Sequence, residues 1–222
     1  MSEITDFLQS KEEIKGNYEL LTVSHPKIEE NYGTICIVKV NLDSKDNKPL
    51  LIVPGYSNDS FESGFNIVLS GLEHLKKKYS VLYMLCWGST IKKLSKDYIS
   101  EEFRGKLAVV LDKIIRSPEL DLTNLTILAK SAGAGVCIPV TSMNTEVKSL
   151  FIACPAINSY GELLANRKDL PIKLCWNKDD DKISYSESEK FINDFKKQGN
   201  KYKFFSYEKG GHEFNEKFIL EL

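Results

Sequence analysis

The sequence has no apolar run that approaches the length of a membrane-spanning helix. Its first residues, Met1–Asp6, lack the basic start and the apolar core of a secretory signal peptide. These two absences predict a protein that does not span a membrane and that is located in the cytoplasm.

An excess of charge of either sign is also missing. The 222 residues include 30 Lys and Arg against 31 Asp and Glu, which gives a net charge of −1. Non-specific nucleic-acid binding needs a concentrated basic face, so this balance argues against a nucleic-acid partner. The hydrophobic content of 42% and the charged content of 27% are ordinary for a globular protein, and the length lies within the range of one domain.

Metal-ligand spacing is absent among the five cysteines. Most of them lie inside apolar runs, which is typical of buried, reduced thiols in a cytosolic protein. None lies at a turn beside a candidate base. We therefore expect no bound metal, no cofactor and no catalytic cysteine among Cys36, Cys86, Cys137, Cys154 and Cys175.

What the sequence does contain is an apolar run that ends abruptly in small residues, LTILAKSAGAGVCIPV at 125–140. The run predicts a buried strand, and the small residues after it predict the opening of a helix. Ala129 and Gly133 lie two residues before and two after Ser131. A serine raised on a tight strand-to-helix turn has a strained backbone and needs small residues at these positions. Ser131 is therefore the candidate nucleophile, and a Gly/Ala-rich turn without function is the alternative.

Apolar strands alternate with amphipathic helices along the chain. Besides the strand before Ser131, the patterns predict strands at 18–23, 34–40, 50–53, 80–86, 148–153, 171–176 and 201–207, and helices at 61–78, after Ser100, after Ser186 and at 213–222. Such alternation indicates an α/β fold, with a mostly parallel central sheet and helices on both of its faces. We expect one α/β domain over residues 18–222, preceded at 1–17 by a short surface helix or a frayed segment.

A serine hydroxyl is a weak nucleophile at neutral pH and needs a base within hydrogen-bond reach. Histidine suits this task, and the chain has only three. His25 lies in a turn before the parallel part of the sheet, and His74 lies off the apolar stripe of a predicted helix, so both are expected at the surface. His212 follows the last predicted strand, beside glycines that let the chain bring an imidazole over the edge of the sheet. It is the candidate base, and a surface histidine before a helix is the alternative.

The carboxylate that orients the imidazole is expected from Asp179, Asp180 or Asp181, just past the predicted strand 171–176. The spacing favours Asp180, because Ile183 three residues later can be buried while the two neighbouring aspartates point elsewhere. A solvated acidic loop is the alternative interpretation of this segment.

Ser131, Asp180 and His212 each follow the carboxyl end of a predicted strand. In parallel sheets, ligands bind outside the carboxyl ends of the strands. A hydroxyl, a carboxylate and an imidazole are therefore predicted at the same rim of the sheet, although they are far apart in the sequence.

This order of serine, acid and histidine resembles the α/β-hydrolase superfamily, over nearly all of the chain from about residue 18. The sequence WNKDDDKI at 176–183 is similar to the family's acid motif, and GHEF at 211–214 is similar to its histidine motif. The resemblance implies an oxyanion hole formed by the backbone N–H groups of Tyr56 and Ala132. The family commonly has His-Gly-x in the loop after the third strand, whereas Pro54 stands here in place of the histidine.

Many members of this family insert a lid between the two strands that are predicted here at 148–153 and 171–176. A connection of 17 residues has room for a turn or a short helix. We therefore expect no cap domain and an open site, which resembles a lidless serine esterase or thioesterase.

Together these features predict a serine hydrolase that cleaves carboxylic ester or thioester bonds in a small-molecule or acyl substrate. In this prediction Ser131 attacks the carbonyl group, His212 shuttles the proton and Asp180 holds the imidazole. Two alternatives remain open: a catalytically inactive binding protein on the same fold, and a small peptidase or an acyltransferase that uses the same triad. The sequence specifies neither the substrate nor the oligomeric state.

Overall fold

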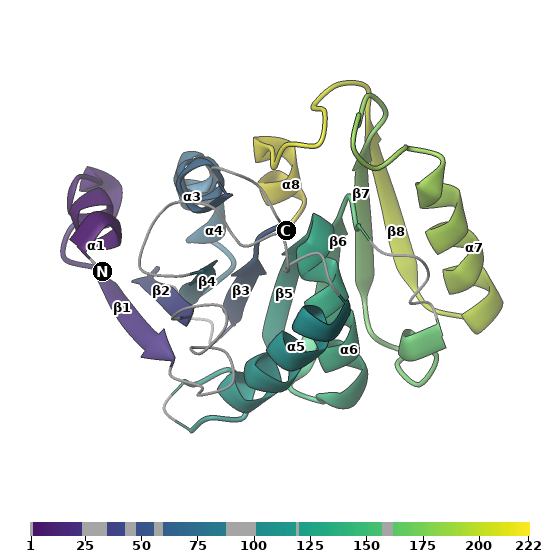
Figure 1. Ribbon diagram of the computed structural model, residues 1–222, viewed down its shortest axis with the longest axis horizontal. Helices are drawn as coiled ribbons and strands as arrows, with labels where there is room; N and C mark the ends of the chain where they lie inside the picture. Colours follow the sequence, from purple (N-terminus) through teal and green to yellow (C-terminus); the bar gives the residue numbers. More distant parts are fainter. Residues whose placement is uncertain are drawn as a thin grey trace.

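The computed structural model of the chain describes residues 2–23, 35–42, 48–55, 60–87, 101–118, 120–156 and 162–222. Its strands form one eight-stranded sheet in the order β1-β2-β4-β3-β5-β6-β7-β8 (Figure 1). The strands are β1 (Tyr18–Val23), β2 (Ile35–Asn41), β3 (Pro49–Val53), β4 (Val81–Trp87), β5 (Leu125–Lys130), β6 (Val147–Ala153), β7 (Ile172–Asn177) and β8 (Tyr202–Tyr207). Strand β2 is antiparallel to β1 and β4, and every other neighbouring pair is parallel. The predicted mostly parallel sheet is confirmed.

The central strands are apolar because the sheet is covered on both faces. All five residues of β3 are buried, as are the last four residues of both β5 and β6. By contrast, β8 lies at the edge of the sheet and has no fully buried residue. Continuous apolar runs of this kind are typical of parallel strands between two layers of helices.

The helices cover the sheet from both sides (Figure 1). They are α1 (Ser2–Gln9), α3 (Ser60–Ser70), α4 (Leu72–Leu75), α5 (Glu101–Ile115), α6 (Ala134–Met143), α7 (Glu187–Gln198) and α8 (Glu216–Glu221), with short 3₁₀ turns at η1 (Glu12–Ile14), η3 (Ser131–Gly133) and η4 (Glu162–Leu164). The connection from β3 to β4 runs in one direction along the sheet. The connections from β4 to β5 and from β5 to β6 run in the opposite direction. Right-handed crossovers therefore place α3 on one face and α5 and α6 on the opposite face.

This reversal of direction creates the place for a site. The chain leaves β3 toward β4 and leaves β5 toward β6, so the neighbouring strands β3 and β5 send their connections to opposite sides. A crevice opens at such a switch point, outside the carboxyl ends of the strands. Pro54 and Gly55 follow β3, and Ser131 follows β5.

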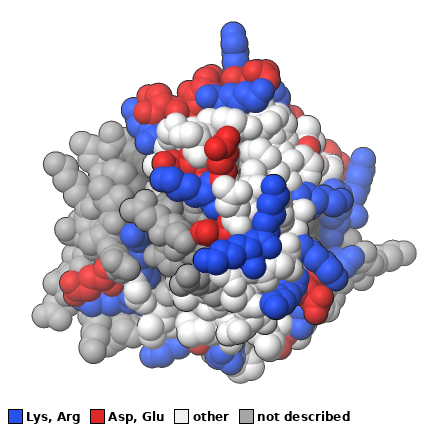
Figure 2. Space-filling view, turned by 90° about the vertical axis from the view of Figure 1, so that its right-hand side faces the viewer, with Lys and Arg blue, Asp and Glu red and all other residues white. Residues whose placement is uncertain are grey.

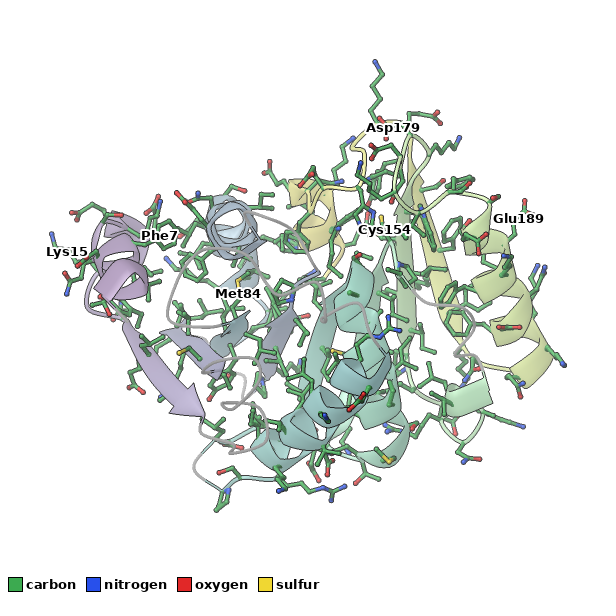
Figure 3. The ribbon with its side chains drawn as sticks, viewed as in Figure 1. Phe7, Lys15, Met84, Cys154, Asp179 and Glu189 are labelled. Atoms are coloured by element: carbon green, nitrogen blue, oxygen red, sulfur yellow. The ribbon has the colours of Figure 1, made fainter. Side chains whose placement is uncertain are left out.

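The N-terminal helix α1 packs against α3. Figure 3 shows Phe7 on the side of α1 that faces α3. The ring of Phe7 meets that of Phe65 edge-on, with 6.0 Å between the ring centroids. Leu8 and Ile14 are also buried, so residues 2–17 contribute side chains to the main hydrophobic core.

Two expectations from the sequence need correction on the α3 side of the sheet. The helix predicted over 61–78 is interrupted at Gly71, which separates α3 from α4. His74 in α4 is half-buried rather than exposed, and burial, together with the neighbouring lysines, lowers its pKa. Among the helices of the described segments, none combines the length and the apolar character needed to cross a membrane.

Candidate active site

Ser131 lies at a sharp turn between β5 and α6. Its φ angle is +49°, which is in the left-handed region that side chains other than glycine rarely adopt. The 3₁₀ turn η3 follows directly and leads into α6. This strained strand-to-helix turn raises the serine side chain above the carboxyl end of the strand. Ser131 is 4% exposed, so the hydroxyl group is shielded from bulk water.

The small residues around Ser131 have a steric cause. A Cβ atom on Gly133 would lie 2.5 Å from the carbonyl oxygen of Val53 and 2.7 Å from that of Pro54. Both contacts are with backbone atoms, which cannot move aside as the end of a side chain can. The residue two positions after Ser131 therefore lets the turn press against the end of β3.

Replacing Gly133 with alanine is expected to lower the free energy of unfolding by about 1–3 kcal/mol, because the new methyl group overpacks this contact. Urea denaturation measures the change. Gly105 in the exposed part of α5 is the matched control, since a Cβ there meets no atom within 4 Å. Gly105→Ala is expected to stabilise the protein by about 0.5–1 kcal/mol through helix propensity. Equal midpoints and slopes for both variants would contradict this account.

The three predicted polar residues are in mutual contact. The Nε2 atom of His212 lies 2.8 Å from the Oγ atom of Ser131, and its Nδ1 atom lies 2.8 Å from the Oδ2 atom of Asp180. An ionised carboxylate can only accept hydrogen bonds, so Nδ1 carries the proton and donates it to Asp180. Nε2 is then left unprotonated, and it accepts the hydrogen bond of the Ser131 hydroxyl group.

Asp180 is the aspartate that the fold selects from its acidic run. Its side chain is fully buried, and its Oδ1 atom accepts the backbone N–H groups of Lys182 at 2.9 Å and Ile183 at 2.8 Å. The carbonyl group of Ile183 in turn accepts a hydrogen bond from the Trp176 indole at 3.0 Å, which holds the turn against β7. Asp181 is exposed and pairs with Lys182.

The charge of the Asp180 carboxylate is stabilised where it lies. Burial acts to raise its pKa, but the hydrogen bonds from His212, Ile183 and Lys182 outweigh that effect and lower the pKa. The group is therefore ionised at neutral pH and faces the imidazole as an anion. An anion in this position can hold the ring orientation and stabilise the imidazolium form when His212 takes up a proton.

The loop that carries the histidine is fixed from both sides of Gly211. The side chain of the buried Asn177 donates a hydrogen bond to the carbonyl oxygen of Gly211 at 2.9 Å. The N–H group of Gly211 donates to the carboxylate of Asp179 at 2.7 Å. Asn215 donates to the Asn177 side-chain oxygen at 3.2 Å and caps α8 through the N–H group of Phe218. The preceding Gly210 has a φ of +155° and leaves no room for a Cβ beside the amide of Asn177.

Sequence reasoning did not identify Asn177 and Asn215 as supporting residues. The available signal was a polar residue at the end of an otherwise apolar strand, where a buried amide needs partners. Asp179 was expected only to point away from the imidazole, whereas it binds the loop backbone. Figure 3 shows Asp179 at the same edge of the fold as Cys154, which follows β6.

Cys154 directly follows β6, the strand between β5 and β7, and its thiol is not suited to act as a nucleophile. The residue is fully buried. Burial, with the adjoining Asp180 carboxylate, raises the pKa of the thiol to about 12. The group is therefore protonated at neutral pH, and the thiolate is the reactive form of cysteine.

The remaining site predictions are only partly within the described residues. Ala132 follows Ser131 in η3 and is buried. Tyr56, the other predicted oxyanion donor, and His25 lie outside the described residues. Between β6 and β7 the described residues form only the short turn η4. Within the described part of the chain, no group of three or more His, Cys, Asp or Glu side chains is arranged to hold a metal ion.

Comparison of the fold with solved structures finds similar chains of similar size. A predicted CIB-like hydrolase from Thermoplasma acidophilum has a TM-score of 0.64 at 16% identity, covering 91% of this chain and 94% of that one. An alpha-beta serine hydrolase homologue from Coxiella burnetii has a TM-score of 0.61 at 16% identity, with coverages of 91% and 92%. Est1E from Butyrivibrio proteoclasticus has a TM-score of 0.62 at 11% identity, with coverages of 91% and 94%. No protein-family model matches the sequence, and no curated protein matches it.

Proposed function

The chain has the α/β-hydrolase fold, and on this premise we propose that it is a serine hydrolase that cleaves carboxylic ester or thioester bonds. The observation that carries the proposal is the pair of 2.8 Å contacts that link Ser131 to His212 and His212 to Asp180. The three residues follow the ends of three different strands, and a hydroxyl, an imidazole and a buried carboxylate in series is the arrangement that activates a serine.

In the first half of the reaction, Ser131 Oγ attacks the substrate carbonyl carbon while its proton passes to His212 Nε2. The carbonyl oxygen becomes an oxyanion, for which the backbone N–H groups of Ala132 and Tyr56 are the proposed donors. The intermediate then collapses, the bond to the alcohol oxygen or the thiol sulfur breaks, and His212 gives its proton to that leaving group. The acyl group remains on Ser131 as an ester.

In the second half, a water molecule gives a proton to His212 Nε2 and attacks the acyl carbon. The tetrahedral intermediate collapses, the bond to Ser131 Oγ breaks, and His212 returns the proton to the serine. The products are a carboxylic acid and the free enzyme. Asp180 stays ionised throughout, since its lowered pKa and its three hydrogen bonds favour the charged form.

The choice of ester or thioester substrates rests on the short connection between β6 and β7. The 17 residues between the predicted strands have no room for a lid domain. An open site is expected to accept acyl groups that are directly accessible, with water as the acceptor of the acyl group.

A panel of p-nitrophenyl esters with graded acyl lengths, assayed beside acyl-coenzyme A thioesters of the same acids, tests this proposal. We expect turnover of at least one series and a loss of roughly 10⁴-fold or more in Ser131→Ala. If neither series is turned over by the folded parent, the proposal is wrong and the binding-protein alternative is favoured. Turnover that persists in Ser131→Ala would place the chemistry elsewhere.

A further inference from the structure

Lys130, the residue directly before Ser131, has a charged side chain that is almost fully buried. It ends β5 and is 6% exposed. Lysine side chains are rarely buried to this extent unless they are paired, because removing an ammonium group from water is costly. A lysine in this position therefore needs an explanation.

The ammonium group has no partner that offsets this cost. Among the described residues no hydrogen bond or ion pair holds it. Burial lowers the pKa of Lys130, and the carboxylates of Asp180 and Glu213 act against that effect without outweighing it. The hydrogen bonds of Asp180 go to the imidazole and to two backbone N–H groups, and none goes to Lys130.

The stem of Lys130 lies at the switch point of the sheet. A Cβ atom placed on Gly55 would lie 3.4 Å from Lys130 Cγ and 2.7 Å from Ser131 Cβ. The lysine stem and the serine side chain therefore flank the same turn after β3. The carboxylates of Asp180 and Glu213 are near enough to act on the charge of the ammonium group.

We infer that Lys130 is a specificity-determining residue that binds a carboxylate group of the substrate close to the scissile carbonyl. The inference rests on the proposed function and narrows it to esters or thioesters that carry a carboxylate. The ammonium group has three hydrogen-bond donors and no acceptor bonded to them, and a substrate carboxylate would supply that acceptor. A hydrogen bond between two charged partners in a shielded site is strong.

The exposed charges on the face that carries α7 and β8 are mixed in sign. Basic and acidic side chains are interspersed over the face that carries α7 and β8 (Figure 2). Several lysines of this region are exposed and paired, as in the contacts of Lys178 with Glu208, Lys190 with Glu187 and Lys201 with Asp169. Lys130 differs from them in being both buried and unpaired.

Two matched substrate pairs test the inference. In the first pair, p-nitrophenyl hemisuccinate and p-nitrophenyl butyrate differ by a carboxylate on the acyl side. In the second pair, 4-acetoxybenzoate and phenyl acetate differ by a carboxylate on the leaving group. The measured quantity is the kcat/KM ratio of the anionic member to the neutral member, compared between the parent and each variant so that intrinsic reactivity cancels.

Lys130→Met keeps the length of the stem beside Gly55 and removes the charge. For at least one pair we expect this ratio to fall by roughly tenfold or more, while hydrolysis of the neutral member is retained. The pair that responds identifies the side of the substrate that carries the carboxylate. Lys130→Gln, which keeps a polar end, serves if the methionine variant does not fold. Lys209→Met removes a positive charge from an exposed position of the histidine loop and is expected to leave both ratios unchanged.

Ratios that stay at the parent value in Lys130→Met would overturn the inference. So would equal losses for both members of each pair, since Lys130 would then act on the triad, or an equal effect of Lys209→Met, since a general field would then suffice. If the parent hydrolyses no ester and a fluorophosphonate does not label Ser131, the proposed function fails and this inference fails with it. Labelling and neutral-ester turnover without a carboxylate preference would refute this inference alone.

Discussion

Replacing His212 with alanine is expected to lower kcat by roughly 10⁴- to 10⁶-fold, the range found when the base of a serine triad is removed. His212 Nε2 is the atom within hydrogen-bond distance of Ser131 Oγ at 2.8 Å. Without it the hydroxyl keeps its proton, and the leaving group receives none. Steady-state hydrolysis of the best ester from the panel measures the effect.

The loss must come from chemistry and not from unfolding. His212 is 13% exposed at its side chain and lies in a loop whose backbone is held by other residues, so thermal unfolding of His212→Ala is expected to stay close to that of the parent. His74→Ala is the matched control, because it removes a histidine from the α4 region, outside the contacts of the site. Near-normal turnover in a folded His212→Ala variant would exclude this residue as the base.

Asp180→Asn is expected to lower kcat by about 10⁴-fold, with little change in KM. An asparagine of the same shape presents either an amide N–H₂ group or a neutral oxygen to His212 Nδ1. In the first case the proton moves to Nε2, and the ring can no longer accept the hydrogen bond of Ser131. In either case the imidazolium form loses the anion that stabilises it.

The two neighbouring aspartates are the controls for this substitution. Asp179→Asn keeps an oxygen that can accept the N–H group of Gly211, and Asp181→Asn removes only an exposed ion pair with Lys182. Both variants are expected to keep kcat within severalfold of the parent. A loss in either one that matches Asp180→Asn would show that the triad carboxylate has been assigned to the wrong residue.

The fold could be predicted because its strands are short, apolar and regularly separated by helices. The strand predicted at 50–53 corresponds to β3, and the strand at 171–176 corresponds to β7 with a shift of one residue. Burial on both faces of a parallel sheet leaves a continuous apolar signal that a local pattern can detect. The order of the strands in the sheet was not specified by that pattern.

The ends and breaks of the helices were harder to predict because tertiary contacts decide them. The last helix was expected at 213–222 and begins at Glu216, since the side chain of Asn215 accepts the N–H group of Phe218 and caps it there. The helix after Ser186 begins as expected at Glu187. It ends before Gly199, whose backbone has a left-handed conformation. The glycine could be recognised from the sequence as the end of its helix, whereas the cap at Asn215 is identified only by its hydrogen bond.

The convergence of Ser131, Asp180 and His212 followed from one topological rule, since each residue comes after the carboxyl end of a parallel strand. The supporting contacts could not be found in this way. Whether Asn177 donates to the histidine loop depends on the path of that loop, which is set by the two glycines at positive φ angles. The burial of Lys130 could not be predicted either, because a single lysine at the end of an apolar run is common and is usually exposed.

The central claim is that the hydroxyl group of Ser131 is an activated nucleophile, and reaction with a fluorophosphonate tests it most directly. Intact-mass measurement followed by peptide mapping identifies the labelled residue. We predict a single covalent adduct on Ser131 and no adduct in Ser131→Ala. A folded parent protein that forms no adduct, or an adduct on another residue that persists in Ser131→Ala, would contradict the account.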